Sequence, residues 1–140
     1  MSADFIDANV FVYLFDETDN RKQTLANQCV QRALEHASGV ISFQVVQETL
    51  NVLTRKLKVP LLPDDAQDFL NQVLQPLWKV QPSTALYTRA LGLQKVLSIS
   101  FYDSLIVAAA LQAGCKRLLT EDLQHGQRIE GLRIENPFRA

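Results

Sequence analysis

The chain has 140 residues, a formal net charge of −1, a hydrophobic fraction of 47% and a charged fraction of 21%. These values are typical of one globular domain, which we expect to span residues 1–140. They argue against a strongly basic binder of duplex nucleic acid, and the apolar run over 104–115 is shorter than the roughly 20 residues that a membrane-spanning helix needs.

The first half of the chain alternates short apolar runs with helical patterns. Apolar residues at four-residue spacing predict a helix over 21–37, which Gly39 would end. Ser42 is a favoured helix cap, and the apolar stripe that follows it predicts a second helix to about Leu57. Short strands are expected at 5–6 and 40–41.

The second half begins at Pro60 and Pro63, which interrupt the helical pattern. Asp64 and Gln67 fit a capping box and predict a new helix. The remaining expected elements are a strand over 77–80, a helix that Ser83 caps and that ends near Leu97, a helix over 101–113 between Ser100 and Gly114, and strands over 116–120 and 132–135.

Strands that alternate with helices are typical of an α/β fold with a mainly parallel sheet and helices on both faces. The helix over 101–113 consists largely of Ala, Leu, Ile and Val, which favours a helix packed on both sides. The chain begins without the basic and apolar segments of an export signal, so we expect a cytoplasmic protein. In that compartment, Cys29 and Cys115 are expected to be free thiols.

Four acidic residues fall where an α/β fold builds its sites, outside the carboxyl ends of the strands. Asp7 follows the first predicted strand, and Asp122 follows the strand over 116–120. Glu48 and Asp103 lie in the first turns of two predicted helices. If both helices begin at the same edge of the sheet, all four carboxylates converge there.

Each of these residues also suits a purely structural role. Asp7 can cap the helix that follows it, and Asp103 can complete a capping box with Ser100 or stabilise the helix dipole. Asp122 suits a turn. Glu48 lies at the edge of an apolar stripe, where a solvated side chain is ordinary.

Together the four carboxylates would repel one another and raise one another's pKa values unless a cation lay between them. Carboxylate oxygens are the ligands that Mg²⁺ and Mn²⁺ prefer. Ions held in this way activate water and stabilise displacement at a phosphodiester. The acidic set therefore predicts a metal-dependent nuclease with Asp7, Glu48, Asp103 and Asp122 as metal ligands and catalytic residues.

Two polar residues are the expected support for this site. Asn9 stands two positions after Asp7 and can hold a carboxylate or a metal-bound water, and Thr120 stands two before Asp122 and can orient it. Both also suit ordinary roles, in a first helical turn and at a strand end. Glu121 is expected to be a solvated neighbour.

Two basic residues, Arg55 and Lys56, follow the helix that carries Glu48. They are candidates for contacts with RNA phosphates. A solvated helix end that the helix dipole favours is the simpler interpretation.

The sequence resembles the PIN-domain family in four places. The stretch at 4–13 resembles the opening motif of an apolar strand, Asp, a small residue, Asn and an apolar helix. The stretches at 42–48, 101–106 and 118–122 resemble the second, third and fourth motifs, the last in its Thr-x-Asp form. Each motif is weak by itself, but the four occur in the family's order and cover nearly the whole chain.

The resemblance implies a three-layer α/β/α fold and a metal-dependent ribonuclease that uses Mg²⁺ or Mn²⁺. A stand-alone chain of this length is most similar to the VapC-type toxins of prokaryotic toxin–antitoxin pairs. Those toxins typically form homodimers and are inhibited by a small antitoxin that covers the acidic site. RNA is then the implied substrate, although the chain lacks the basic excess of many RNA-binding proteins.

Two other functions fit parts of the pattern. A non-catalytic PIN-like module could use the same fold to bind RNA or protein, but the complete acidic set argues against it. A phosphoacceptor signalling domain also gathers carboxylates around Mg²⁺ and pairs its phosphoryl group with a Lys after a late strand. Here Lys116 lies at the start of its strand and not after it, so this alternative is the weaker one.

Overall fold

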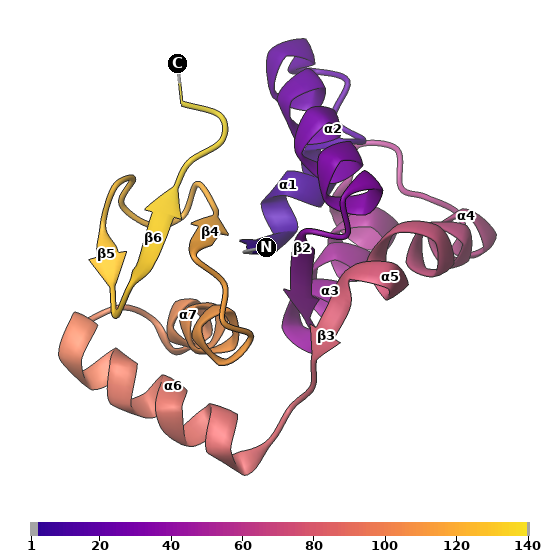
Figure 1. The fold of residues 1–140 in the computed structure, drawn as a ribbon. Helices are drawn as coiled ribbons and strands as arrows, with labels where there is room; N and C mark the ends of the chain where they lie inside the picture. Colours follow the sequence, from indigo (N-terminus) through magenta and orange to yellow (C-terminus); the bar gives the residue numbers. More distant parts are fainter. Residues whose placement is uncertain (1–2, 140) are drawn as a thin grey trace.

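The computed structural model describes residues 3–139, and the rest of the expected domain (residues 1, 2 and 140) lies outside the described residues. Within this range a six-stranded sheet has the order β3-β2-β1-β4-β6-β5 (Figure 1). The strands are β1 (Asp4–Ile6), β2 (Gly39–Ser42), β3 (Trp78–Val80), β4 (Arg117–Leu119), β5 (Arg128–Ile129) and β6 (Leu132–Glu135). All pairings are parallel except that of β5 with β6, so the predicted, mainly parallel α/β sheet is confirmed.

Helices connect the strands and pack against the sheet. They are α1 (Ala8–Tyr13), α2 (Asn20–Glu35), α3 (Phe43–Asn51), α4 (Pro63–Phe69), α5 (Gln75–Leu77), α6 (Thr84–Leu97) and α7 (Phe101–Gln112), with π-helical turns η1 (Val52–Lys56) and η2 (Leu70–Leu74). Helix α7 contacts β2, β4 and α6, and its residues 104–110 are all buried. The prediction of a helix packed on both sides is therefore confirmed.

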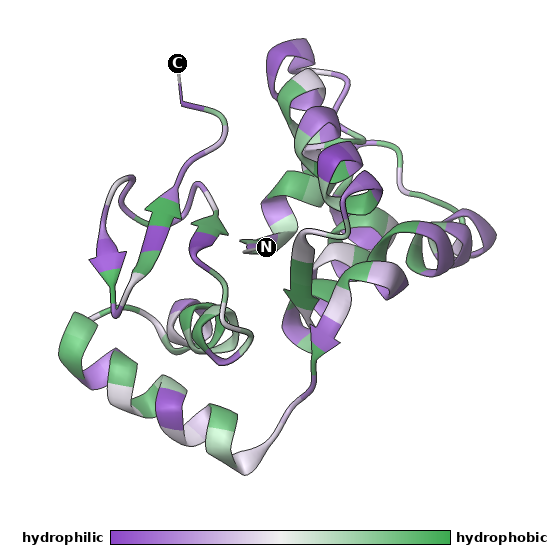
Figure 2. Cartoon of the chain, in the orientation of Figure 1, coloured by the Kyte–Doolittle hydropathy of each residue, from purple (hydrophilic) through white to green (hydrophobic). Residues whose placement is uncertain are grey.

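Apolar residues of the central strands form the middle of the core. Phe5, Ile41, Leu118 and Ile134 come from four neighbouring strands and are fully buried. The outer helices α2 and α6 carry mixed hydrophilic and hydrophobic residues along their length (Figure 2). Among residues 3–139, no single helix is long and apolar enough to cross a membrane, and α6 and α7 reach that length only as a pair bent by 118°.

The carboxyl ends of β1 and β4 lie next to each other in the sheet. Ile6 is paired with Leu119, and the N–H of Asp7 donates a hydrogen bond to the Leu119 carbonyl at 3.0 Å. Because the two strands are parallel, the segments that follow them leave the sheet at the same edge. Asp7 and Thr120 are therefore brought together by the register of the sheet.

The structure corrects two details of the predicted elements. Asp64 does not cap α4, because the helix already begins at Pro63, whose fixed φ and missing N–H suit a first helical position. The turn after α2 is made by Ala37, with φ 50°, and not by Gly39. Gly39 instead begins β2, where an added Cβ would lie 2.6 Å from the Cβ of Ala33. The glycine thus permits the close approach of α2 to the sheet.

Candidate active site

Asp7 lies where β1 ends and α1 begins. It occupies the N-cap position of α1, and its Oδ1 accepts a hydrogen bond from the Ala8 N–H at 2.7 Å. Its Oδ2 accepts a hydrogen bond from the Thr120 hydroxyl at 2.8 Å, and only 6% of the residue is exposed. The capping role is therefore real, but it leaves acceptor capacity on both carboxylate oxygens.

Burial perturbs the ionisation of Asp7. The pKa of its carboxyl is raised from 3.8 to about 7, mainly by desolvation. The hydrogen bonds from Thr120 and Ala8 oppose the rise, whereas the negative charges of Asp122 and Glu48 add to it. A cation beside this group would favour its charged form, so the carboxyl is suited to bind one.

Asp7 contributes to a cavity of about 510 Å³ that also involves α1, α3 and η1. Three of the four predicted acids, Asp7, Glu48 and Asp122, line this cavity. The complete polar lining is Asp7, Asn9, Glu48, Asn51, Lys56 and Asp122, with Tyr13 and small apolar side chains beside it.

Glu48 is held by a residue that the sequence analysis did not single out. Gln44, one turn earlier in α3, donates from Nε2 to Glu48 Oε1 at 2.9 Å and to the Tyr102 carbonyl at 3.1 Å. Gln44 is buried, so it links Glu48 firmly to the first turn of α7. The four-residue spacing of Gln44 and Glu48, which puts both on one helix face, was the signal present in the sequence.

Asp103 lies in the first turn of α7 and outside the lining of the cavity. Its backbone N–H donates to Ser100 Oγ at 3.1 Å, as the capping interpretation expects. Its charge nevertheless contributes to the raised pKa of Asp122. Asp103 is thus an acidic neighbour of the cavity and not part of its wall.

Asp122 extends from the loop after β4, and its N–H donates to Thr120 Oγ1 at 3.1 Å. Its pKa is raised by desolvation, then by the charges of Asp103 and Glu121, and the nearby Asn9 amide opposes the rise. Among the described residues, however, the buried oxygen and nitrogen of that amide make no hydrogen bond of ordinary geometry. Asn9 can therefore bind a carboxylate, a water or an ion.

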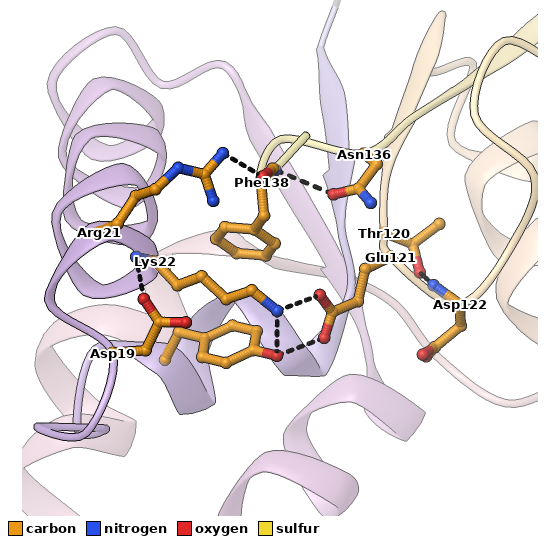
Figure 3. Close-up of polar contacts among 9 residues, drawn as sticks. Asp19, Arg21, Lys22, Thr120, Glu121, Asp122, Asn136 and Phe138 are labelled. Carbon is orange, nitrogen blue, oxygen red and sulfur yellow. Dashed lines mark hydrogen bonds and ion pairs between the residues drawn. The ribbon is translucent and has the colours of Figure 1, made fainter. Parts of the chain in front are cut away.

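Glu121 is not the solvated neighbour that the sequence predicts. Tyr13 donates its hydroxyl to Glu121 Oε1, and Lys22 Nζ donates to Glu121 Oε2 at 3.1 Å and to Tyr13 Oη at 3.0 Å (Figure 3). We term these residues the Tyr13–Lys22–Glu121 cluster. Burial and then Glu121 raise the pKa of Tyr13, and the hydrogen bonds with Tyr13 and Glu121 raise that of Lys22. At neutral pH the phenol is neutral and the ammonium is charged.

The two basic candidates differ in their relation to the cavity. Both are exposed to solvent, but Lys56 is part of the cavity lining and Arg55 is not. The structure therefore brings Lys56, but not Arg55, to the acidic group.

The donors at the cavity suit a hard divalent cation. Asp7, Glu48, Asp122 and Asn9 all offer oxygen. As the side chains of residues 3–139 stand, no three Asp, Glu, His or Cys groups are close enough to ligate one ion together. Mg²⁺ often uses only one or two carboxylates and keeps several waters, so Asp7 and Asp122 with Asn9 beside them form a suitable set.

A second cavity, of about 220 Å³, lies beneath α2 and is a poorer candidate. Its acidic residues, Asp4 and Glu135, are paired with Arg117 at 2.5 and 2.6 Å. Their charges are thus already compensated within the protein. Cys29 in its wall and Cys115 are free thiols, as predicted.

Solved structures of toxin–antitoxin proteins have a similar fold. VapBC from Salmonella typhimurium, solved with DNA, gives a TM-score of 0.67 at 18% identity over 98% of this chain and 99% of that one. A toxin–antitoxin complex from Klebsiella pneumoniae gives 0.66 at 18% identity over 96% and 98%. VapC20 from Mycobacterium tuberculosis, a toxin that cleaves the sarcin–ricin loop, gives 0.60 at 19% identity over 86% and 90%. At these identities the likeness establishes the fold.

No curated protein gives a significant sequence match. The sequence model of the PIN domain, by contrast, matches residues 5–128. This range begins in β1, ends in β5 and contains Asp7, Glu48, Asp103 and Asp122. The chain therefore belongs to the PIN-domain family.

Proposed function

We propose that this chain is a divalent-metal-dependent endoribonuclease that hydrolyses phosphodiester bonds of RNA. The observation that carries the proposal is the buried carboxyl of Asp7, whose pKa is raised to about 7 and which shares a cavity with Glu48 and Asp122. Mutual repulsion of these groups would be relieved by Mg²⁺ or Mn²⁺. Membership of the PIN-domain family supports the same chemistry.

Each cavity residue has a separate role in this proposal. Mg²⁺ or Mn²⁺, when bound, would lower the pKa of a water and compensate the charge of the phosphate. Asp7 and Asp122 would hold the ion, with the Asn9 amide available as a further oxygen donor. Glu48, fixed by Gln44, takes a proton from the attacking water.

The residues around the cavity have less direct tasks. Asp103 adds negative charge next to Asp122 and thereby favours a cation there. Lys56, at the cavity wall, contacts a phosphate of the RNA. Arg55 lies outside the cavity and contributes to the general attraction of the strand.

We further propose that the chain is the toxin of a toxin–antitoxin pair and acts in the cytoplasm as a homodimer. The similar structures from Salmonella typhimurium and Klebsiella pneumoniae, which are toxin–antitoxin complexes, support an antitoxin as partner. An acidic cavity is also a good target for an Arg or Lys of an antitoxin, because a basic side chain there replaces the compensating charge of the cation.

The test is to incubate the purified chain with a pool of structured RNAs and either Mg²⁺ or Mn²⁺. Asp7→Asn serves as the matched variant, since Asn keeps the size of the side chain and an oxygen that caps α1. We expect discrete RNA fragments from the wild type, none after EDTA, and at least a 100-fold slower cleavage by Asp7→Asn, which is typical for loss of a catalytic group.

Calorimetric titration with Mn²⁺ accompanies the cleavage assay. Binding by the wild type and its loss in Asp7→Asn would support the proposed cation site. Cleavage that survives EDTA, or full activity of Asp7→Asn, would contradict the metal-dependent mechanism. Absence of both Mn²⁺ binding and cleavage would favour a non-catalytic PIN module that binds RNA or protein.

A further inference from the structure

We propose that the Tyr13–Lys22–Glu121 cluster is a positioning device that holds Asp122 at the cavity, an inference that rests on the proposed role of Asp122 in binding the cation. Glu121 and Asp122 are consecutive residues in the irregular segment between β4 and β5. In Figure 3, Glu121 is directed toward Lys22, whereas Asp122 is directed away from it. Fixing the first side chain therefore restricts the position of the second.

The segment that carries Asp122 has few other attachments. Asp122 itself is exposed, and its backbone N–H is hydrogen-bonded to the side chain of Thr120, at 3.1 Å. The next backbone hydrogen bonds along the segment run from the Gln127 N–H to the Gln124 carbonyl, at 3.2 Å, and from the Gly126 N–H to the Ile134 carbonyl, at 2.8 Å. Further along, Leu123 packs against the core and His125 Nδ1 accepts a hydrogen bond from the Asn136 N–H at 3.0 Å. The side chain of Glu121 is thus the anchor adjacent to Asp122.

The cluster is well suited to be that anchor because it joins three elements. Tyr13 comes from α1, Lys22 from α2 and Glu121 from the segment after β4. The side chains of Lys22 and Glu121 are only 27% and 23% exposed, so their attraction is weakly screened by solvent. Lys22 Nζ also lies 4.7 Å from the centroid of the Tyr13 ring, within the range of a cation–π interaction.

The segment around Phe138 also packs against the Tyr13–Lys22–Glu121 cluster. The ring of Phe138 is buried and packs edge-to-face on Tyr13, with centroids 4.8 Å apart. Arg21 donates a hydrogen bond to the Phe138 carbonyl and holds this segment against α2 (Figure 3). Packing therefore holds the Tyr13 ring in place independently of the contact between its hydroxyl and Glu121.

The same contacts argue against Glu121 as a direct ligand of the cation. Its Oε1 accepts from Tyr13, and its Oε2 forms an ion pair with Lys22 at 3.1 Å, so the charge of Glu121 is already compensated within the protein. The pair of Arg89 and Glu130, 2.9 Å apart, is a useful contrast, because these side chains are 42% and 56% exposed and do not line the acidic cavity. Loss of that pair should leave the cation site unchanged.

The experiment is calorimetric titration of the full chain with Mn²⁺. Tyr13→Phe removes only the hydroxyl, and Glu121→Gln removes the charge; we expect each to weaken Mn²⁺ binding about 10-fold, as loss of a residue that orients a ligand typically does. The control Glu130→Gln should bind like the wild type. In an Asp122→Asn background, Glu121→Gln should cause no further loss, because it acts through Asp122. A further loss of similar size in that background would overturn the proposal.

Hydrogen exchange of the metal-free protein gives a readout that does not depend on the proposed function. In Tyr13→Phe the amides of residues 121–124 should exchange faster than in the wild type, with those of β1 and α7 unchanged. Unchanged exchange at 121–124 would overturn the positioning role. If the wild type bound no Mn²⁺, the proposed cation site would fail, and hydrogen exchange would still decide whether the cluster holds this segment.

Discussion

The hydroxyl of Thr120 donates a hydrogen bond to Asp7 Oδ2 at 2.8 Å, and the hydroxyl oxygen of Thr120 itself accepts one from the Asp122 N–H at 3.1 Å. One fully buried side chain thus connects the carboxyl that follows β1 with the segment that follows β4. Its bond to Asp7 lowers the pKa of that carboxyl and so opposes the larger effect of burial. Thr120 therefore acts on both the ionisation of Asp7 and the position of Asp122.

Replacing Thr120 with Val keeps the shape of the side chain and removes its hydroxyl. The pKa of Asp7 should rise further, so we expect the pH at half-maximal Mn²⁺ binding to increase by about one unit. The unpaired Asp122 N–H should lower the free energy of unfolding by about 1–2 kcal/mol. Thr120→Ser, which keeps the hydroxyl, should retain the wild-type midpoint. Equal midpoints for the Val and Ser variants would show that the hydroxyl does not control Asp7.

Asp7 should make the stability of the fold depend on pH. Its folded-state pKa, about 7, lies above its ordinary value of 3.8, so the folded chain keeps a proton that the unfolded chain releases between these values. The free energy of unfolding therefore falls as the pH rises from about 4 to 7, by an amount on the order of 4 kcal/mol. Above pH 7 the loss is complete.

Asp7→Asn should abolish this dependence. Asn cannot ionise and still offers an oxygen to the Ala8 N–H, so its Tm should exceed that of the wild type by several degrees at pH 8 and approach it near pH 4. The measurement is thermal unfolding in EDTA at several pH values, which keeps cations from masking the effect. A variant less stable than the wild type at pH 8 would show that the carboxylate is compensated within the protein.

The sequence was sufficient to predict the sheet and most of the site. Its apolar runs, separated by helical patterns, predict the parallel strands. Asp7 and Asp122 were identified because they follow strand ends, and the functional sites of α/β sheets lie outside the carboxyl ends of the strands. The strand β5 was not predicted, since it has two residues and depends on a turn in which Glu130 and Gly131 both take positive φ. Glutamate is not among the residues that predict a hairpin turn at such a position.

The side-chain contacts around the acids could not be read from the sequence. Glu121 meets residues more than ninety positions away, and nothing in the local pattern of T-E-D indicates that its side chain turns toward α1 and α2. Ser42 occupies the predicted N-cap of α3 but makes no capping hydrogen bond with its side chain. Such contacts depend on how elements pack, whereas strand ends are encoded locally.

Gln44 should support catalysis through Glu48. Gln44→Met keeps the volume of this buried side chain and removes the donor to Glu48 Oε1 and the Tyr102 carbonyl. We expect kcat for RNA cleavage to fall about 10-fold, with KM little changed, because Glu48 loses its fixed orientation. Gln47→Met, an exposed change in the same helix, is the matched control. Equal activity of both variants would show that Gln44 does not support catalysis.

Lys56 should contribute to the salt dependence of RNA binding. Both residues are exposed to solvent, but Lys56 lines the acidic cavity and Arg55 does not. A contact with one phosphate of a single strand contributes about 0.7 to the slope of log affinity against log salt, so Lys56→Ala should reduce that slope by about this amount and Arg55→Ala should change it less. The measurement is kcat/KM for RNA cleavage at several salt concentrations. If the two variants lowered the slope equally, the attraction would come from the overall charge of this helix end, and the position of Lys56 in the cavity wall would have no special role in holding the substrate.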